Sequence, residues 1–79
     1  MRIIDQVRLE VEKYLGVSPG YSFGKTRKRE IAEARQLTAY FAYELEVANF
    51  EQIGQYFGKG HSTILQGVKK IKLKYGYDK

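Results

Sequence analysis

The sequence predicts an all-α fold, a small four-helix domain that contains a helix-turn-helix. Three observations predict this class: apolar residues recur at helical spacing in four segments, glycines separate the segments, and no alternation of apolar and polar residues indicates a strand. We expect helices at about residues 2–15, 29–46, 50–57 and 61–75. At 79 residues, without an internal repeat, the chain fits a single domain over residues 1–79.

Length and composition argue against several classes of function. A chain of this size buries roughly 60% of its extended surface, which leaves little material for an enclosed catalytic cleft. With no cysteine and one histidine, the sequence cannot assemble a metal site from thiolates and imidazoles, and it has no P-loop. We therefore expect no enzyme and no bound cofactor or metal. The sequence has no signal peptide that would predict secretion. It also has no long apolar run that would predict a membrane span.

The charge distribution favours an anionic partner. The net charge is +5, and Lys25, Arg27, Lys28 and Arg29 fall within five residues. Five more lysines follow residue 51 before the next acid. A solvated basic surface is the alternative explanation for these charges.

The first helix, residues 2–15, has apolar residues at helical spacing. These are Ile3, Ile4, Val7, Val11, Tyr14 and Leu15. Arg8 and Glu12, four residues apart, are expected to form an exposed pair of opposite charge. Gly16 is expected to end the helix.

The connector at residues 17–24 leads into a basic loop, residues 24–29, and then into the long second helix. Val17, Tyr21 and Phe23 are expected to hold the connector against the core. The core positions of the second helix are expected to be Ile31, Ala34, Thr38, Phe41 and Leu45. On this helix Arg35 should emerge at the border of the core, and Gln36 should point further outward.

Residues 50–75 predict the helix-turn-helix. Asn49 is a suitable N-cap for a short helix in which Gly54 allows a second helix to come close, and Gly58 and Gly60 form the turn. The buried face of the last helix is expected to contain Ile64, Val68, Ile71 and Tyr75. The opposite face then carries Ser62, Gln66 and Lys69, with Thr63 and Lys70 beside them. Such a polar, positive face is typical of a helix that enters the major groove of DNA.

Three motifs of this chain resemble the C-terminal DNA-binding domain of the bacterial replication initiator DnaA. GKTRKREIAEARQ, residues 24–36, is similar to the basic loop and following helix of that family. IGQYFG, residues 53–58, is similar to the first helix of its helix-turn-helix, and HSTI, residues 61–64, to the start of its recognition helix. The resemblance covers nearly the whole chain in the same order.

The resemblance implies double-stranded DNA as the partner, and a cytoplasmic, nucleoid-associated protein. It implies that Arg27 enters the minor groove, with Lys25 and Arg29 near phosphates. It also implies that the backbone is contacted by Arg35 and Gln36, and that base edges in the major groove are approached by His61, Ser62 and Thr63. The helical wheel adds Gln66 and Lys69 to the face that meets DNA.

The chain departs from the family at the turn, and other functions stay open. The family has an arginine and an acid before the histidine, where this chain has Lys59-Gly60 and is one residue shorter. The family's ATPase module has no counterpart in these 79 residues. Protein interaction with an acidic partner, structured-RNA binding and a Trp-repressor-like regulator are the alternatives to sequence-selective DNA binding.

Overall fold

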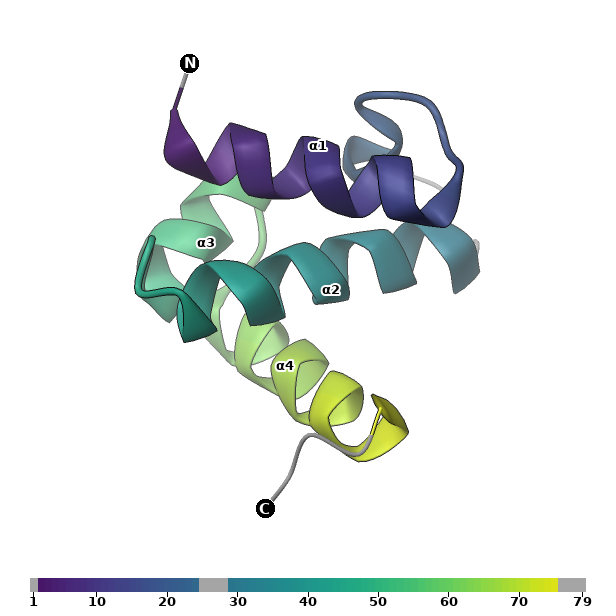
Figure 1. Cartoon of the computed structure of the whole chain (residues 1–79). Coiled ribbons are helices and arrows are strands. Elements are labelled where there is room, and N and C mark those ends of the chain that lie inside the picture. The colour runs from purple at the N-terminus through teal and green to yellow at the C-terminus, as the bar shows by residue number, and fades with distance from the viewer. Residues whose placement is uncertain (1, 25–28, 76–79) are drawn as a thin grey trace.

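The computed structural model describes residues 2–24 and 29–75, and this part of the chain is helical without strands. The helices are α1 (Ile3–Leu15), α2 (Arg29–Glu44), α3 (Phe50–Phe57) and α4 (His61–Tyr75), with a short 3₁₀ turn, η1 (Tyr21–Phe23), between α1 and α2. The predicted fold class is confirmed, and α2 ends two residues earlier than expected (Figure 1). It ends there because the chain turns at Glu46, which has a φ of 58°.

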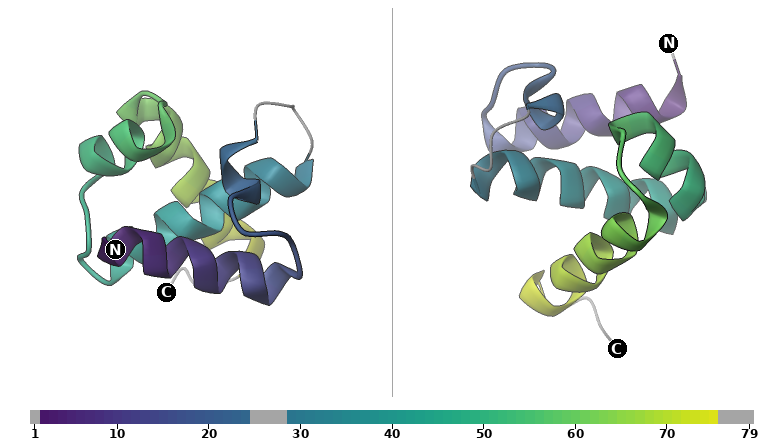
Figure 2. Two further views of the ribbon diagram at one scale, coloured as in Figure 1. Left: turned by 90° about the horizontal axis from the view of Figure 1, so that it is seen from above. Right: turned by 180° about the vertical axis from the view of Figure 1, so that it is seen from behind.

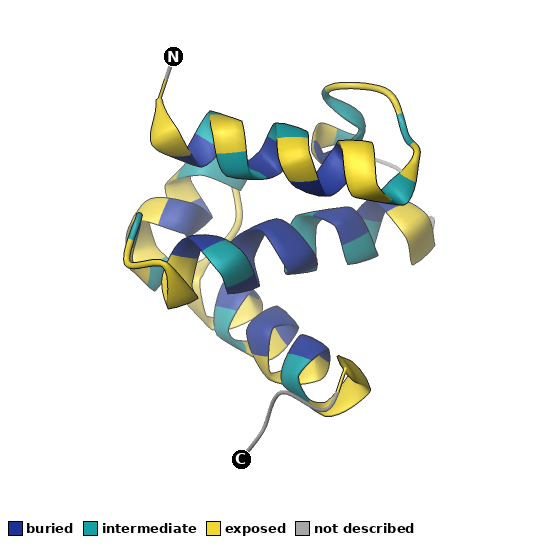
Figure 3. Cartoon of the chain, in the orientation of Figure 1, coloured by how far each residue is buried: buried dark blue, intermediate teal, exposed yellow. Residues whose placement is uncertain are grey.

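α2 runs through the middle of the molecule, and the other helices pack around it (Figures 1 and 2). α1 and η1 lie on one side of α2, and α4 crosses it on the other. The buried side chains face this centre, as Figure 3 shows. The core consists of Ile4, Val11, Leu37, Ala39, Tyr40, Ala42, Ile53, Ile64, Val68 and Ile71.

The caps that the sequence predicted are present. Gly16 ends α1 with a left-handed φ of 74°, and its N–H donates to the carbonyl of Lys13 at 3.1 Å. Asn49 caps α3: its side-chain oxygen accepts from the N–H of Gln52 at 2.8 Å, and the Gln52 side chain accepts from the N–H of Asn49 at 2.9 Å. This reciprocal pair is a capping box, which satisfies two backbone donors that a helix start leaves free.

Two expected core positions are wrong. Leu45 is 65% exposed because α2 ends before it, and Tyr75 is 38% exposed because it is the last residue of α4. Of the other expected positions on α2, Ile31, Ala34 and Thr38 are buried and Phe41 is half-buried. The buried face of α2 is wider than one stripe because α1 and α4 pack on different sides of it.

The expectation that Arg8 and Glu12 form an exposed pair is also wrong. Arg8 is 9% and Glu12 1% exposed, and the Arg8 guanidinium donates to the Glu12 carboxylate at 2.7 Å. The connector covers this pair, because the backbone N–H groups of Gly20 and Ser22 each donate to Glu12 at 3.0 Å. A helical wheel of α1 gives no information about a connector that folds back over it.

The same cluster reaches α3. Arg8 Nε donates to the Tyr56 hydroxyl at 2.9 Å, and this hydroxyl donates to the carboxylate of Asp5. Phe23, the last residue of η1, packs against the rings of Tyr56 and Phe57 at centroid distances of 5.3 and 5.6 Å. Phe23 therefore lies against α3 but stays 44% exposed, and the 3₁₀ turn that carries it packs on α2 and α1.

Burial and hydrogen bonding act in opposite directions on Glu12. Burial by itself would raise the pKa of this carboxyl, but the donated hydrogen bonds from the backbone N–H groups of Ser22 and Gly20, together with Arg8, lower the pKa below its usual value of 4.5. A carboxyl with a lowered pKa in the folded state stabilises the fold above its unfolded pKa. This stabilisation is lost as the pH falls through the lower, folded value.

We expect Glu12→Gln to lower the free energy of unfolding at neutral pH by about 2–4 kcal/mol, because Arg8 then stays buried without its nearest counter-charge. The loss should shrink as the pH falls below 4.5, where the carboxyl of the unfolded chain takes up a proton first, and it should reach its minimum once the pH has fallen through the lower pKa of the folded state. Urea unfolding at several pH values measures this. Glu10→Gln, on the exposed side of α1, is the matched control and should have little effect. An equal loss at neutral and acid pH would contradict the assignment.

Candidate nucleic-acid interface

The turn between α3 and α4 depends on close contact at Gly54. A Cβ atom at this position would lie 2.5 Å from the carbonyl oxygen of Lys59 and 3.5 Å from the N of His61. The Lys59 N–H donates to the carbonyl of Gly54 at 2.8 Å, and Gly58 ends α3 with a left-handed φ of 68°. Gly54 therefore does permit the close approach that the sequence predicted, and the approaching backbone is that of the turn and the first residue of α4.

α4 is amphipathic in the predicted sense. Ile64, Val68 and Ile71 are buried, together with Gly67. The predicted site residues of this helix are all exposed: His61, Ser62, Thr63, Gln66 and Lys69. α4 thus presents a continuous polar face to solvent, beginning at its amino-terminal end.

Two predicted residues of α2 meet α4 beside Thr63. Arg35 and Gln36 line a small depression between the helices together with Thr63 and Gly67. We had expected Gln36 to point further outward than Arg35. Both side chains are half-buried. Gln36 packs over α4 instead, since a Cβ at Gly67 would lie 2.8 Å from Cγ of Gln36.

Further along the same two helices lies a cleft of about 380 Å³ whose lining holds three basic residues and one acid, Glu33. Arg29, the exposed first residue of α2, lines this cleft with Gln36 and Lys70. Lys70 is not among the site residues predicted from the sequence. The signal was present, because Lys70 follows Thr63 by seven residues, which is two helical turns.

The lysines of α4 differ in their partners. Lys74 forms a salt bridge with Glu33 of α2, and Lys72 lies 4.0 Å from Glu44. The hydrogen bonds from Lys74 and from the Tyr75 hydroxyl lower the pKa of Glu33, so this acid stays ionised. Lys69 and Lys70 form no salt bridge with another residue of the described ranges. Their charges are available to an anionic partner.

The structure brings some predicted site residues together and leaves others undescribed. Arg29, Arg35, Gln36 and Thr63 line the boundary between α2 and α4. Lys25 and Arg27 of the basic loop lie outside the described residues. Within residues 2–24 and 29–75, no three potential metal-ligating side chains are grouped, and no helix is long and apolar enough to cross a membrane.

Comparison with known proteins matches the motifs found in the sequence. A family described as "Bacterial dnaA protein helix-turn-helix" matches residues 4–71. The "Chromosomal replication initiator protein DnaA" of Deinococcus radiodurans is 35% identical over 69 residues, which are 87% of this chain and 15% of that protein. The protein of the same name from Kosmotoga olearia is 33% identical over 73 residues, 92% of this chain and 16% of that protein.

The chain therefore spans less than a fifth of the length of these curated relatives. The same name is given to a Thermus thermophilus protein that is 36% identical over 64 residues, 80% of this chain and 15% of that protein. No solved structure gives a significant match.

We expect Gly54→Ala to lower the free energy of unfolding by about 1–3 kcal/mol. The new Cβ meets a backbone carbonyl at 2.5 Å, and overpacking of this kind outweighs the roughly 1 kcal/mol that alanine gains over glycine in a helix. Gly60→Ala is the matched control, because a Cβ there meets no atom within 4 Å. Thermal unfolding of both variants tests this, and equal stability of the two would argue against the close contact.

Proposed function

The chain belongs to the bacterial DnaA helix-turn-helix family, and from this premise we propose that it binds double-stranded DNA as part of replication initiation or its regulation. The family match over residues 4–71 supports the proposal, and so does the exposed polar face of α4. The relatives are named as chromosomal replication initiators, which supports a role of this chain in that process. Those proteins are several times longer than this chain. In this proposal the chain is a binding domain and carries out no catalysis.

The observation that carries the proposal is the exposure of His61, Ser62 and Thr63 at the amino-terminal end of α4. Residues at this end of a recognition helix meet base edges in the major groove. A hydroxyl can donate to or accept from a base, and the methyl group of threonine can contact that of thymine. Gln66 and Lys69 extend the same face along the helix.

The phosphate contacts of the proposal come from α2 and from α4. Arg35 and Gln36 lie beside Thr63. In the proposal they contact the sugar-phosphate backbone of the DNA when Thr63 contacts a base. Arg29 and Lys70 line the basic cleft next to them. The family resemblance adds Lys25 at phosphates and Arg27 in the minor groove. Phosphate contacts fix the position of the domain on the duplex, and base contacts select the sequence.

The turn before α4 bears on which sequence is bound. A carboxylate before the histidine, present in the family, can accept a hydrogen bond from an exocyclic base amine. This chain has Lys59-Gly60 there and offers no such acceptor. We therefore propose a preferred site that differs from the family's own at the base pair which that acid would read.

Affinity for duplex DNA should fall steeply with salt. With about five phosphates engaged, the slope of log K against log salt concentration is expected to be roughly −4 to −5. Lys70→Gln and Lys69→Gln should each weaken binding to all sequences and reduce the slope by about 1. Lys72→Gln is the matched control on the same helix, because Lys72 already lies near Glu44. A salt-independent affinity would refute phosphate contact.

Thr63→Ala and His61→Ala should change which sequence is preferred, while binding to unrelated duplexes changes little. Selection of bound duplexes from a random pool, followed by sequencing, measures this for each variant. Competition distinguishes groove recognition from charge alone. If single-stranded RNA or an acidic polypeptide of equal charge displaces the duplex, the protein acts as a general polyanion binder.

A further inference from the structure

The basic cleft between α2 and α4 has one acid among the described residues that line it. Its polar lining residues are Arg29, Glu33, Gln36, Lys70 and Lys74. Arg29 and Glu33 are four residues apart on α2, and Lys70 and Lys74 are four apart on α4, so each helix contributes two charged side chains from one face. The basic side chains attract a phosphate and the carboxylate repels it. The position of this carboxylate therefore bears on how the cleft meets DNA.

Glu33 has a basic neighbour on each helix. Arg29 precedes it by one turn of α2, and side chains of opposite charge at this spacing attract each other. The carboxylate is nevertheless bound by α4: the Lys74 ammonium donates to Oε2 of Glu33, and the Tyr75 hydroxyl donates to the same oxygen at 2.7 Å. Within residues 2–24 and 29–75 the Arg29 guanidinium forms no salt bridge. Its charge is left for another anion.

The charge of Arg29 still acts on this carboxylate. The hydrogen bonds from Lys74 and Tyr75 are the main causes of the lowered pKa of Glu33, and the charge of Arg29 lowers it further. The Glu33 side chain is 22% and the Lys74 side chain 45% exposed. An ion pair in contact with water to this extent adds little to stability. Its main consequence is where it holds the carboxylate.

We propose that Lys74 and Tyr75 are positioning residues for the phosphate contact of Arg29: they hold the Glu33 carboxylate on the α4 side of the cleft and so leave the Arg29 guanidinium free for a phosphate. This inference rests on the proposed DNA binding. In it neither Lys74 nor Tyr75 needs to touch DNA. Without them the carboxylate is released from α4 and pairs with Arg29, and a phosphate then competes with an anion of the chain itself.

Two simpler roles of the same residues give different results. If Lys74 itself bound a phosphate, its loss would weaken DNA binding whether or not Glu33 is present. If the pair only held the end of α4 in place, loss of either partner would weaken binding alike. In the positioning role, loss of Lys74 weakens binding, whereas loss of Glu33 strengthens it because the competing anion is removed.

A cycle of variants, measured by duplex affinity at several salt concentrations, separates these roles. We expect Lys74→Gln with Tyr75→Phe to weaken binding severalfold and to reduce the salt slope by about 1, as loss of one phosphate contact does. Glu33→Gln should strengthen binding severalfold. In the Glu33→Gln background, the two changes on α4 should have no larger effect than Lys72→Gln. Lys72→Gln and Glu30→Gln are the matched controls for net charge, since neither residue lines the cleft.

NMR spectroscopy without DNA tests the positioning independently of the proposed function. Lys74→Gln with Tyr75→Phe should shift the Arg29 Nε–H resonance, and Glu33→Gln in addition should reverse the shift. If the wild-type chain bound no duplex while this resonance responded, the proposed function would fail and the positioning of Glu33 would stand. An unchanged Arg29 resonance overturns the inference. So does a Glu33→Gln variant that binds DNA as weakly as the α4 variant, with circular dichroism showing both to be folded.

Discussion

The buried carboxylate of Glu12 is the interaction on which the arrangement of the remaining elements depends. It accepts hydrogen bonds from Arg8 and from the N–H groups of Gly20 and Ser22, so it holds the connector against α1. Arg8 passes the link on to α3 through the hydroxyl of Tyr56. A charged group this deeply buried is stable only when its partners are in place. The cluster therefore links α1, η1 and α3 to one another, and it adds to the apolar packing of a small core.

Small residues perform the same task between the last two helices and α2. Gly54 brings the turn close to α3, and Gly67 lets the side chain of Gln36 lie across α4. The consequence is that Arg35 and Gln36 adjoin Thr63, although they are separated from it by about 27 residues of sequence. The polar face of α4 and the basic residues of α2 thus form one surface, and their relative positions depend on the close contacts that Gly54 and Gly67 permit.

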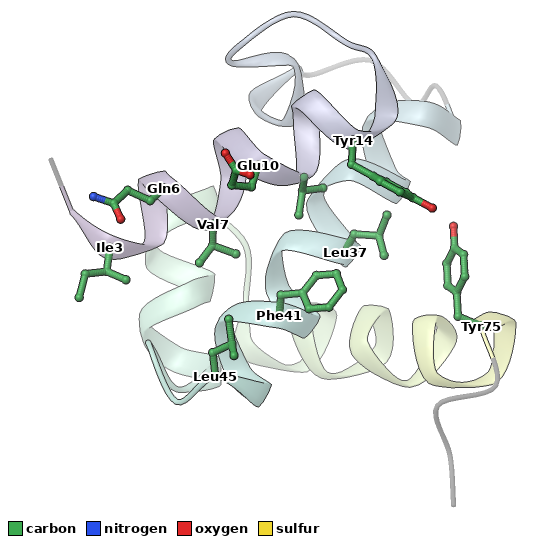
Figure 4. A pocket seen from close by; sticks show the side chains of 10 residues that line it. Ile3, Gln6, Val7, Glu10, Tyr14, Leu37, Phe41, Leu45 and Tyr75 are labelled. Carbon is green, nitrogen blue, oxygen red and sulfur yellow. The ribbon is translucent and has the colours of Figure 1, made fainter.

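The molecule separates two kinds of surface. On the face of α4 that carries His61 to Lys70 the exposed residues are polar, and two of its lysines, Lys69 and Lys70, have no acidic partner within the described ranges. At the groove between α1 and α2 they are mainly aromatic and aliphatic, with Glu10 as the charged residue of the lining (Figure 4). Electrostatic attraction to a polyanion acts on the first surface, and removal of apolar area from water acts on the second.

The sequence by itself determined the four helices, their caps at Gly16 and Asn49, the outward direction of Ser62 and Gln66, and the family. These features depend on interactions between residues within about four positions of each other, which helical spacing and capping motifs record directly. Only the tertiary structure decided that Glu12 is buried, that Leu45 is exposed, and that Lys70 lies in the same cleft as Arg29. Burial and proximity of this kind depend on which distant segment packs on a helix face, and the pattern of a single helix does not contain that information.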